Sequence, residues 1–257
     1  MSLVNTDWLE KHLHNVKIID CSWHMPNVNR NANQEYIEEH IPESIFFDID
    51  KYSNLKTDLP HMLPSSNEWE KIISSLGISN KDKVIIYDNS DVLSSCRCWY
   101  NFIYFGHDPN LVSVLDGGFK KWKLEKRPTT NVLNKVKISN YQAFEKNLMI
   151  KNKNQINKNL INKDFIVIDA RSRGRFEGKD PEPRKDVKGG SIPNSYCLPF
   201  SELINKNHTF KDKKEILIKF EELIDLKSNE NVVFTCGSGV TATVLALAYS
   251  LINNKYV

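Results

Sequence analysis

Long apolar runs are missing from this sequence of 257 residues. A membrane-spanning helix needs about 18 or more consecutive apolar residues, and no stretch approaches that length. The first residues, MSLVNTDWLEKHL, are broken by charged side chains where a secretory signal needs an uninterrupted apolar core. We therefore expect a cytoplasmic protein with no membrane partner.

Cysteine is scarce, and the five cysteines form an odd number: Cys21, Cys96, Cys98, Cys197 and Cys236. They contain no pair of CxxC motifs, which excludes a zinc ribbon, and they are too few for a small disulfide framework. The one close pair, at positions 96 and 98, has no second pair with which to hold a metal. We expect reduced thiols, no metal site, and core or helix-surface positions for this close pair.

An excess of charge of one sign is also missing. The 35 Lys and Arg residues nearly balance 32 Asp and Glu residues, which leaves a formal net charge of +3. This balance excludes nucleic-acid binding through bulk positive charge, and we expect no nucleic-acid partner. With 40% hydrophobic residues, the composition is that of a globular protein with one large or two modest domains.

What the chain does contain is a repeated strand pattern. Short apolar runs that end in Asp or Cys alternate with longer segments of helical period, which is typical of parallel strands joined through helices. Runs 16–20 and 84–88 in the first half have counterparts in runs 165–169 and 232–236 in the second. The ends of the two runs lie 68 residues apart in the first half and 67 residues apart in the second. A phrase at 40–44, HIPES, returns at 191–195 as SIPNS. This pattern predicts an α/β fold with two tandem domains, each a parallel sheet flanked by helices.

Residues 127–163 separate the two copies and are rich in Asn and Lys, with few large apolar side chains. Such a composition is typical of a surface connector leading into a solvated helix. We place the boundary near residue 135 and predict domains at 1–135 and 136–257. Asp88 occupies the position in the first copy that Cys236 occupies in the second, so we predict a non-catalytic first domain.

The segment around Cys236 stands apart, because a strand pattern is followed by CGSGVTA and then by the apolar run of a helix. A residue at the carboxyl end of a parallel strand lies where open α/β sheets bind ligands. Gly237 and Gly239 can adopt positive φ, which allows backbone N–H groups to form an anion nest at the start of the helix. A nest of this kind stabilises a thiolate, so we predict that Cys236 is a nucleophile.

This loop resembles the active-site loop of the rhodanese superfamily, in the form found in 3-mercaptopyruvate sulfurtransferases. The resemblance covers nearly the whole chain and includes residues 6–9, 35–50, 60–64, 114–122 and 169–171. It implies that the Cys236 thiolate takes sulfur from a donor, 3-mercaptopyruvate or thiosulfate, as a persulfide. The sulfur would then pass to cyanide or to an acceptor thiol such as that of thioredoxin. We expect that the protein needs no cofactor and is a monomer.

The resemblance also assigns roles to other residues. Arg175 and Arg184 match the two arginines that bind the pyruvate part of the donor, as guanidinium groups suit a carboxylate. Ser238 and His40 match residues proposed to polarise the donor or move a proton. The remaining loop residues would contact the substrate: Gly237, Gly239, Val240 and Thr241.

The chain departs from the family pattern at three places. Asn31 stands where an Asp usually pairs with the histidine at position 40, and Ser191 stands where a histidine is common. The chain stops at residue 257, whereas family members usually continue into a Trp-containing segment. We therefore expect a second domain that is short of a closing element.

Three alternatives remain to be weighed. A thiosulfate-preferring rhodanese generally has basic residues directly after the cysteine, whereas this loop is neutral there, which favours 3-mercaptopyruvate. A phosphatase on the same fold needs Cys-x5-Arg, and Ala242 at that position excludes it. A non-catalytic binding module of the rhodanese fold is the third alternative, which the inert first domain favours and the intact nucleophile loop opposes.

Overall fold

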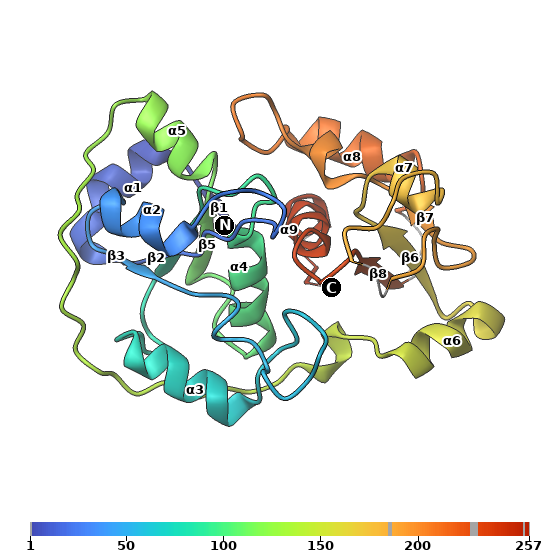
Figure 1. Ribbon diagram of the computed structural model, residues 1–257, viewed down its shortest axis with the longest axis horizontal. Helices are drawn as coiled ribbons and strands as arrows, with labels where there is room; N and C mark the ends of the chain where they lie inside the picture. Colours follow the sequence, from blue (N-terminus) through green and yellow to red (C-terminus); the bar gives the residue numbers. More distant parts are fainter. Residues whose placement is uncertain (1, 185–186, 227–230, 254, 257) are drawn as a thin grey trace. The chain divides into compact units, whose positions relative to one another are not determined.

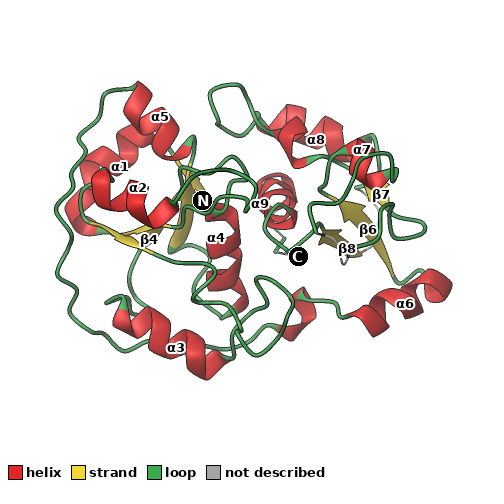
Figure 2. Cartoon of the chain, viewed as in Figure 1, coloured by secondary structure: helices red, strands yellow, loops and turns green. Residues whose placement is uncertain are grey.

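The computed structural model describes residues 2–184, 187–226, 231–253 and 255–256. They form two compact units, Met1–Lys146 with Lys206–Thr209, and Asn147–Asn205 with Phe210–Val257. In each unit, helices lie on either side of parallel strands (Figure 2). The predicted α/β class with parallel sheets flanked by helices is confirmed.

The first unit contains a five-stranded parallel sheet in the order β1-β5-β4-β2-β3. Its strands are β1 Leu3–Val4, β2 Lys17–Asp20, β3 Ser44–Phe46, β4 Val84–Tyr87 and β5 Val112–Leu115. The central strands β2 and β4 pair so that Asp20 lies opposite Tyr87. Asp20 and Asp88 therefore emerge at the same edge of the sheet, where parallel sheets present functional groups.

Helices cover both faces of this sheet, since all four residues of β4 are buried. On one face, Tyr87 packs in a cluster with Leu9 and Trp122. A second aromatic cluster joins two further helices, where Trp69 stacks on Phe105 with ring centroids 4.7 Å apart. The helices, seen in Figure 1, are α1 Thr6–His12, η1 Leu13–Asn15, α2 Ala32–Glu38, α3 Ser66–Ser75, α4 Ser95–Tyr104 and α5 Gly118–Leu124.

The segment after α5 runs along the first unit as a long loop (Figure 1). Tyr141 is only 2% exposed and lies parallel to the ring of His107, with centroids 5.8 Å apart. The backbone N–H of Phe144 donates to the carbonyl oxygen of Phe105 at 3.0 Å. Residues 139–146 are thus held against the first unit, and the domain boundary near residue 135 stays a prediction.

The second unit contains a parallel sheet in the order β7-β6-β8 within the described residues. Asp169 lies opposite Thr235, which places Cys236 one residue beyond the paired strands. Behind the sheet, the rings of Phe220, Phe234 and Tyr249 pack edge to face. The elements are α6 Lys153–Asn162, β6 Phe165–Asp169, α7 Arg173–Phe176, β7 Tyr196–Cys197, α8 Lys213–Glu221, β8 Asn231–Thr235 and α9 Ala242–Asn253, with η2 Asn147–Met149 and η3 Phe200–Leu203.

Two local features of the backbone recur in both units. The register that sets Asp20 opposite Tyr87 is the register that sets Asp169 opposite Thr235. Glu43 and Asn194, at equivalent places in the HIPES and SIPNS phrases, both have left-handed backbones, with φ of 65° and 62°. Side chains with a Cβ rarely adopt this conformation, so its recurrence reflects one turn used twice.

All five cysteines are free thiols, and Cys96 and Cys98 are buried in α4, which selects the core among the two expected placements. Only Cys236 is partly exposed. None of the helices in the described ranges combines the length and the apolar character that crossing a membrane requires.

Candidate active site

The loop between β8 and α9 folds back on the Cys236 thiol. The backbone N–H of Gly239 donates to Sγ of Cys236 at 3.1 Å. Gly239 has a φ of +77°, a conformation that glycine adopts without a Cβ clash and that turns this N–H toward the sulfur. A partly exposed sulfur that accepts a backbone hydrogen bond is well placed to react as a thiolate.

Gly237 serves a different purpose from the one that the sequence suggested. Its backbone lies outside the left-handed region, so only Gly239 uses the freedom expected of both glycines. A Cβ at position 237 would lie 3.3 Å from Nη2 of Arg175. A side chain at position 237 would therefore press on the Arg175 guanidinium and shift it by a few tenths of an ångström, since the guanidinium lies close to the backbone of this loop.

Arg175 reaches this place from the short helix α7, which begins after Ser172. The Ser172 hydroxyl accepts from the backbone N–H of Arg175 at 3.4 Å and so caps the helix. The guanidinium donates to Oε2 of Glu182, at 2.6 Å from Nη2 and 3.2 Å from Nε. The predicted substrate ligand thus lies beside the loop that carries the predicted nucleophile.

Other predicted residues of the second domain also lie on or near this loop. Ser238 is half-buried, and Val240 is 2% exposed at the turn into α9. The Thr241 carbonyl accepts from the first turn of α9 at 3.1 Å. Arg184 is half-buried, and its carbonyl oxygen accepts from the N–H of Val187 at 3.3 Å. The roles of these residues stay predictions.

His40 belongs to the first unit and is fully buried there. Its Nδ1 lies 2.6 Å from the carbonyl oxygen of Tyr36, and its Nε2 lies 3.3 Å from that of Val132. Asn31 accepts from the N–H of Gln34 at 3.0 Å and caps α2. Both ring nitrogens of His40 therefore face backbone carbonyls, and its part in proton movement stays a prediction.

The first unit fills its equivalent loop with a carboxylate. Asp88 is buried directly after β4, and its two oxygens accept backbone N–H groups from Ser90 at 2.9 Å and Ser95 at 2.8 Å. In the second unit the Gly239 amide donates to the Cys236 sulfur, whereas here amides of the loop and of the start of α4 donate to a carboxylate. The non-catalytic role of the first domain stays a prediction.

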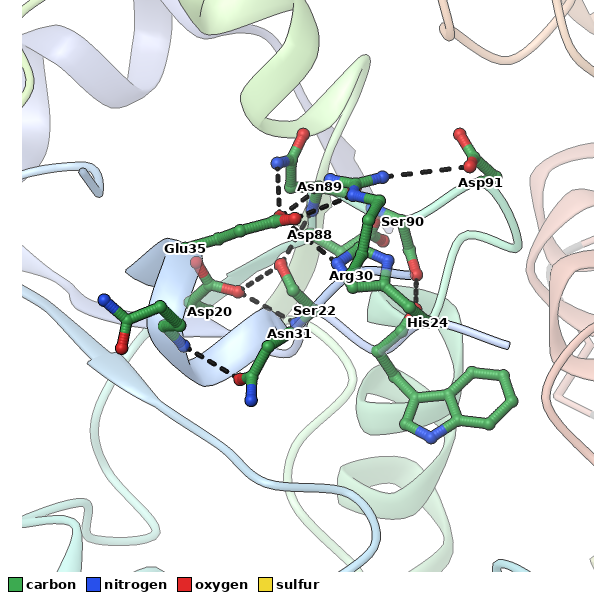
Figure 3. A network of polar contacts seen from close by, with 12 residues as sticks. Asp20, Ser22, His24, Arg30, Asn31, Glu35, Asp88, Asn89, Ser90 and Asp91 are labelled. Atoms are coloured by element: carbon green, nitrogen blue, oxygen red, sulfur yellow. Dashed lines mark hydrogen bonds and ion pairs between the residues drawn. The ribbon is translucent and has the colours of Figure 1, made fainter. Parts of the chain in front are cut away.

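The carboxyl of Asp20, beside this loop, has a raised pKa. Ser22 donates to its Oδ1 through both the backbone N–H and the hydroxyl (Figure 3). Burial nevertheless raises the pKa of Asp20 from 3.8 to about 7, and the charge of Asp88 adds to the rise. The folded chain holds this proton more tightly than the unfolded chain, so the free energy of unfolding falls as the pH rises from about 4 to about 7.

Replacing Asp20 with Asn should therefore stabilise the protein at pH 8, because the amide oxygen can still accept from Ser22 and no charge is buried. We expect a gain of about 1–3 kcal/mol at pH 8 and little change at pH 4, measured by thermal unfolding at both values. Asp58→Asn, at an exposed position, is the control and should show no such difference. An equal gain at both pH values would contradict the assignment.

A carboxylate that sequence reasoning missed completes the site. The side chain of Glu182 is 4% exposed and accepts from Arg171 at 2.7 Å as well as from Arg175. Arg171 in turn donates to Asp169 at the end of β6. Two carboxylates thus balance two guanidinium groups beside the Cys236 loop. The only sequence signal was the PEPR phrase in which Glu182 stands next to a proline on each side.

Comparison with known proteins points to the family that the Cys236 loop resembles. A rhodanese-like domain matches twice, over residues 5–125 and 152–256. The 3-mercaptopyruvate sulfurtransferase of Rattus norvegicus is 38% identical over 96% of this chain and 84% of its own length. The thiosulfate sulfurtransferase of Bos taurus is 34% identical over 96% and 85%. The crystal structure of SseA, a 3-mercaptopyruvate sulfotransferase from Escherichia coli, superposes with a TM-score of 0.88 and 27% identity over 98% of this chain and 95% of that one.

The two domain matches fall on the two structural units, and each relative aligns across both. The repeat, the strand registers and the Cys236 loop had already indicated the same relationship. The chain belongs to the rhodanese-like family and contains two tandem rhodanese-like domains.

Proposed function

We propose that this protein is a sulfurtransferase that takes sulfur from 3-mercaptopyruvate through a persulfide on Cys236. The observation that carries the proposal is the arrangement at one loop. The Cys236 sulfur accepts a backbone hydrogen bond from Gly239, and the Arg175 guanidinium lies against Gly237, one residue from the nucleophile.

The chemistry that this arrangement supports is a transfer of one sulfur atom. The Cys236 thiolate attacks the thiol sulfur of the donor, an S–S bond forms, and the C–S bond of the donor breaks. The electron pair of that bond passes to carbon and gives the enolate of pyruvate, which takes up a proton. An acceptor thiol or cyanide then removes the outer sulfur and restores Cys236.

Charge in the site favours a donor with a single negative charge. Residues 237–239 are neutral, and the charge of Arg175 is already opposed by Glu182. Thiosulfate, a dianion, would gain less from such a site than a carboxylate with an adjacent keto oxygen. Arg175 would bind these oxygens, together with Arg184, and would stabilise the enolate as charge develops on it.

Thiosulfate is the second candidate donor, since some relatives are named for it and one from Arabidopsis thaliana is named for both donors. We expect kcat/KM for 3-mercaptopyruvate to exceed that for thiosulfate by at least about tenfold. Sulfide release measured with each donor, with and without a dithiol reductant, tests this ranking. A preference for thiosulfate would reverse the donor assignment, and no release with either would favour a non-catalytic binding module.

The acceptor, the assembly and the location belong to the same proposal. We infer an acceptor thiol such as that of thioredoxin, because a persulfide is discharged by attack of a thiolate on its outer sulfur. We also infer a monomer in a reducing, cytoplasmic compartment, in keeping with five free thiols. Cell fractionation would test the location, since the Arabidopsis relative is named as mitochondrial.

A further inference from the structure

The buried carboxylate of Glu182 joins two arginines beside the Cys236 loop. Its Oε1 accepts from Nη1 of Arg171 at 2.7 Å, and its Oε2 accepts from Nη2 of Arg175 at 2.6 Å. Burial raises the pKa of this carboxyl, but the hydrogen bonds and charges of Arg175 and Arg171 outweigh it and lower the pKa below its ordinary value. Glu182 is thus negatively charged, and both of its carboxylate oxygens accept hydrogen bonds from arginines.

Arg171 fixes this carboxylate from the sheet side. It is 8% exposed, its Nη2 donates to Oδ2 of Asp169 at 2.6 Å, and the same nitrogen donates to the Gly190 carbonyl at 2.7 Å. Asp169 is the last residue of β6, a strand fully paired with β8. A continuous series of ion pairs therefore runs from the rigid sheet through Glu182 to Arg175.

Arg175 has little else in its own element to orient it. Helix α7 is only four residues long, and the Arg175 side chain is 23% exposed. Glu182 takes two of the five guanidinium N–H donors, and the other three have no hydrogen-bond partner among the residues that the structure describes. An arginine held along one edge presents its remaining donors in a fixed direction.

The first unit contains a comparable arginine–carboxylate pair, in which the arginine precedes helix α2 and the carboxylate lies on it. Arg30 donates to both oxygens of Glu35 at 2.7 Å, and its Nη2 also donates to the carbonyl of Asn89 at 3.1 Å (Figure 3). Asn89 follows Asp88 as Gly237 follows Cys236. In both units a carboxylate thus holds an arginine against the second residue of the loop.

We propose that Glu182 is a positioning residue for sulfur transfer, whose carboxylate holds the Arg175 guanidinium in the direction that binds the donor's oxygens. The proposal rests on the proposed function, in which Arg175 is a donor ligand. Glu182 itself does not touch the donor and acts through Arg175.

An effect of the Glu182 charge and an effect on the position of Arg175 would change the KM in opposite directions. If Glu182 acted only through its charge, its neutralisation would strengthen the positive potential and lower the KM of an anionic donor. If it positions Arg175, neutralisation releases the guanidinium and raises the KM.

The test measures kcat and KM for 3-mercaptopyruvate in Glu182→Gln and Glu182→Asp. We expect the KM to rise about tenfold in Glu182→Gln and less in Glu182→Asp, which keeps the charge on a shorter side chain. The rate of Cys236 labelling by iodoacetamide, a neutral reagent, should change less than about twofold. If Glu182→Gln fails to fold, Glu182→Asp alone must still show a raised KM.

Two comparisons separate positioning from a general effect. Glu202→Gln is the matched control. It removes the carboxylate that Arg173, the neighbour of Arg175 on helix α7, binds at 2.7 Å, and it should leave the KM unchanged. Adding Glu182→Gln to Arg175→Ala should cause no further loss, since Glu182 acts only through Arg175.

An unchanged or lowered KM in Glu182→Gln, an equal rise in Glu202→Gln, or additive losses in the double variant would overturn the proposal. In those cases, normal turnover of 3-mercaptopyruvate by the wild-type protein would leave the proposed function standing. A wild-type protein that releases no sulfide from 3-mercaptopyruvate would overturn both.

Discussion

Replacing Cys236 with Ser should abolish sulfur transfer, with turnover reduced by at least about a thousandfold for any donor. A serine hydroxyl stays protonated at neutral pH and cannot hold the transferred sulfur as a persulfide. The fold should survive, because the side chain is only partly buried and the substitution changes one atom. Sulfide release and thermal unfolding would be measured on the same preparation.

Mass spectrometry gives an independent measurement of the same step. Wild-type protein incubated with donor in the absence of acceptor should gain the mass of one sulfur atom, and the serine variant should not. Cys197→Ser is the matched control in the second domain, since that thiol is buried and its Sγ lies 3.7 Å from the Arg171 carbonyl. Loss of the added mass in the control, with retention in Cys236→Ser, would identify a different sulfur carrier.

Replacing Arg175 with Ala should reduce kcat/KM for 3-mercaptopyruvate by roughly tenfold to a hundredfold. The loss corresponds to a charge-assisted hydrogen bond of about 1.5–3 kcal/mol in a partly desolvated site. We expect a similar loss for Arg184→Ala if both arginines hold the pyruvate part of the donor. Iodoacetamide labelling of Cys236 should barely change, because the Gly239 N–H rather than a guanidinium contacts the sulfur.

Arg173→Ala provides the control for this result. Arg173 lies on the same short helix, is 56% exposed and pairs with Glu202, so its loss should leave kcat/KM nearly unchanged. If Arg175→Ala slowed iodoacetamide labelling as much as turnover, the arginine would be supporting the loop or the fold rather than binding the donor.

The position of the candidate nucleophile could be predicted from the sequence because the signals that single it out are local. A β-rich apolar run, a cysteine, two nearby glycines and an apolar helix follow one another within residues 232–248. Strand, turn and helix are each determined by neighbouring residues. The same locality explains why the runs ending at Asp20, Asp88 and Asp169 were correctly predicted as parallel strands.

Glu182 could not be found in this way, because nothing local distinguishes it from a solvated glutamate. It stands in a charged, proline-containing segment, yet its side chain is 4% exposed and bound by arginines on both sides. The purpose of Gly237 was likewise out of reach, since the atom it accommodates belongs to Arg175, 62 positions earlier in the chain. Tyr141 shows the same limit in the polar connector, where a single ring is buried against His107.

By itself, the sequence determined the α/β class, the duplication, the strand ends and the cysteine at one of them, since hydrophobic period and turn residues act over a few positions. The tertiary structure alone decided which charges are buried together. It brought Asp169, Arg171, Glu182 and Arg175 into one series of ion pairs, and it filled the first loop with Asp88. Burial and pairing depend on contacts between segments distant in the chain, which no local pattern specifies.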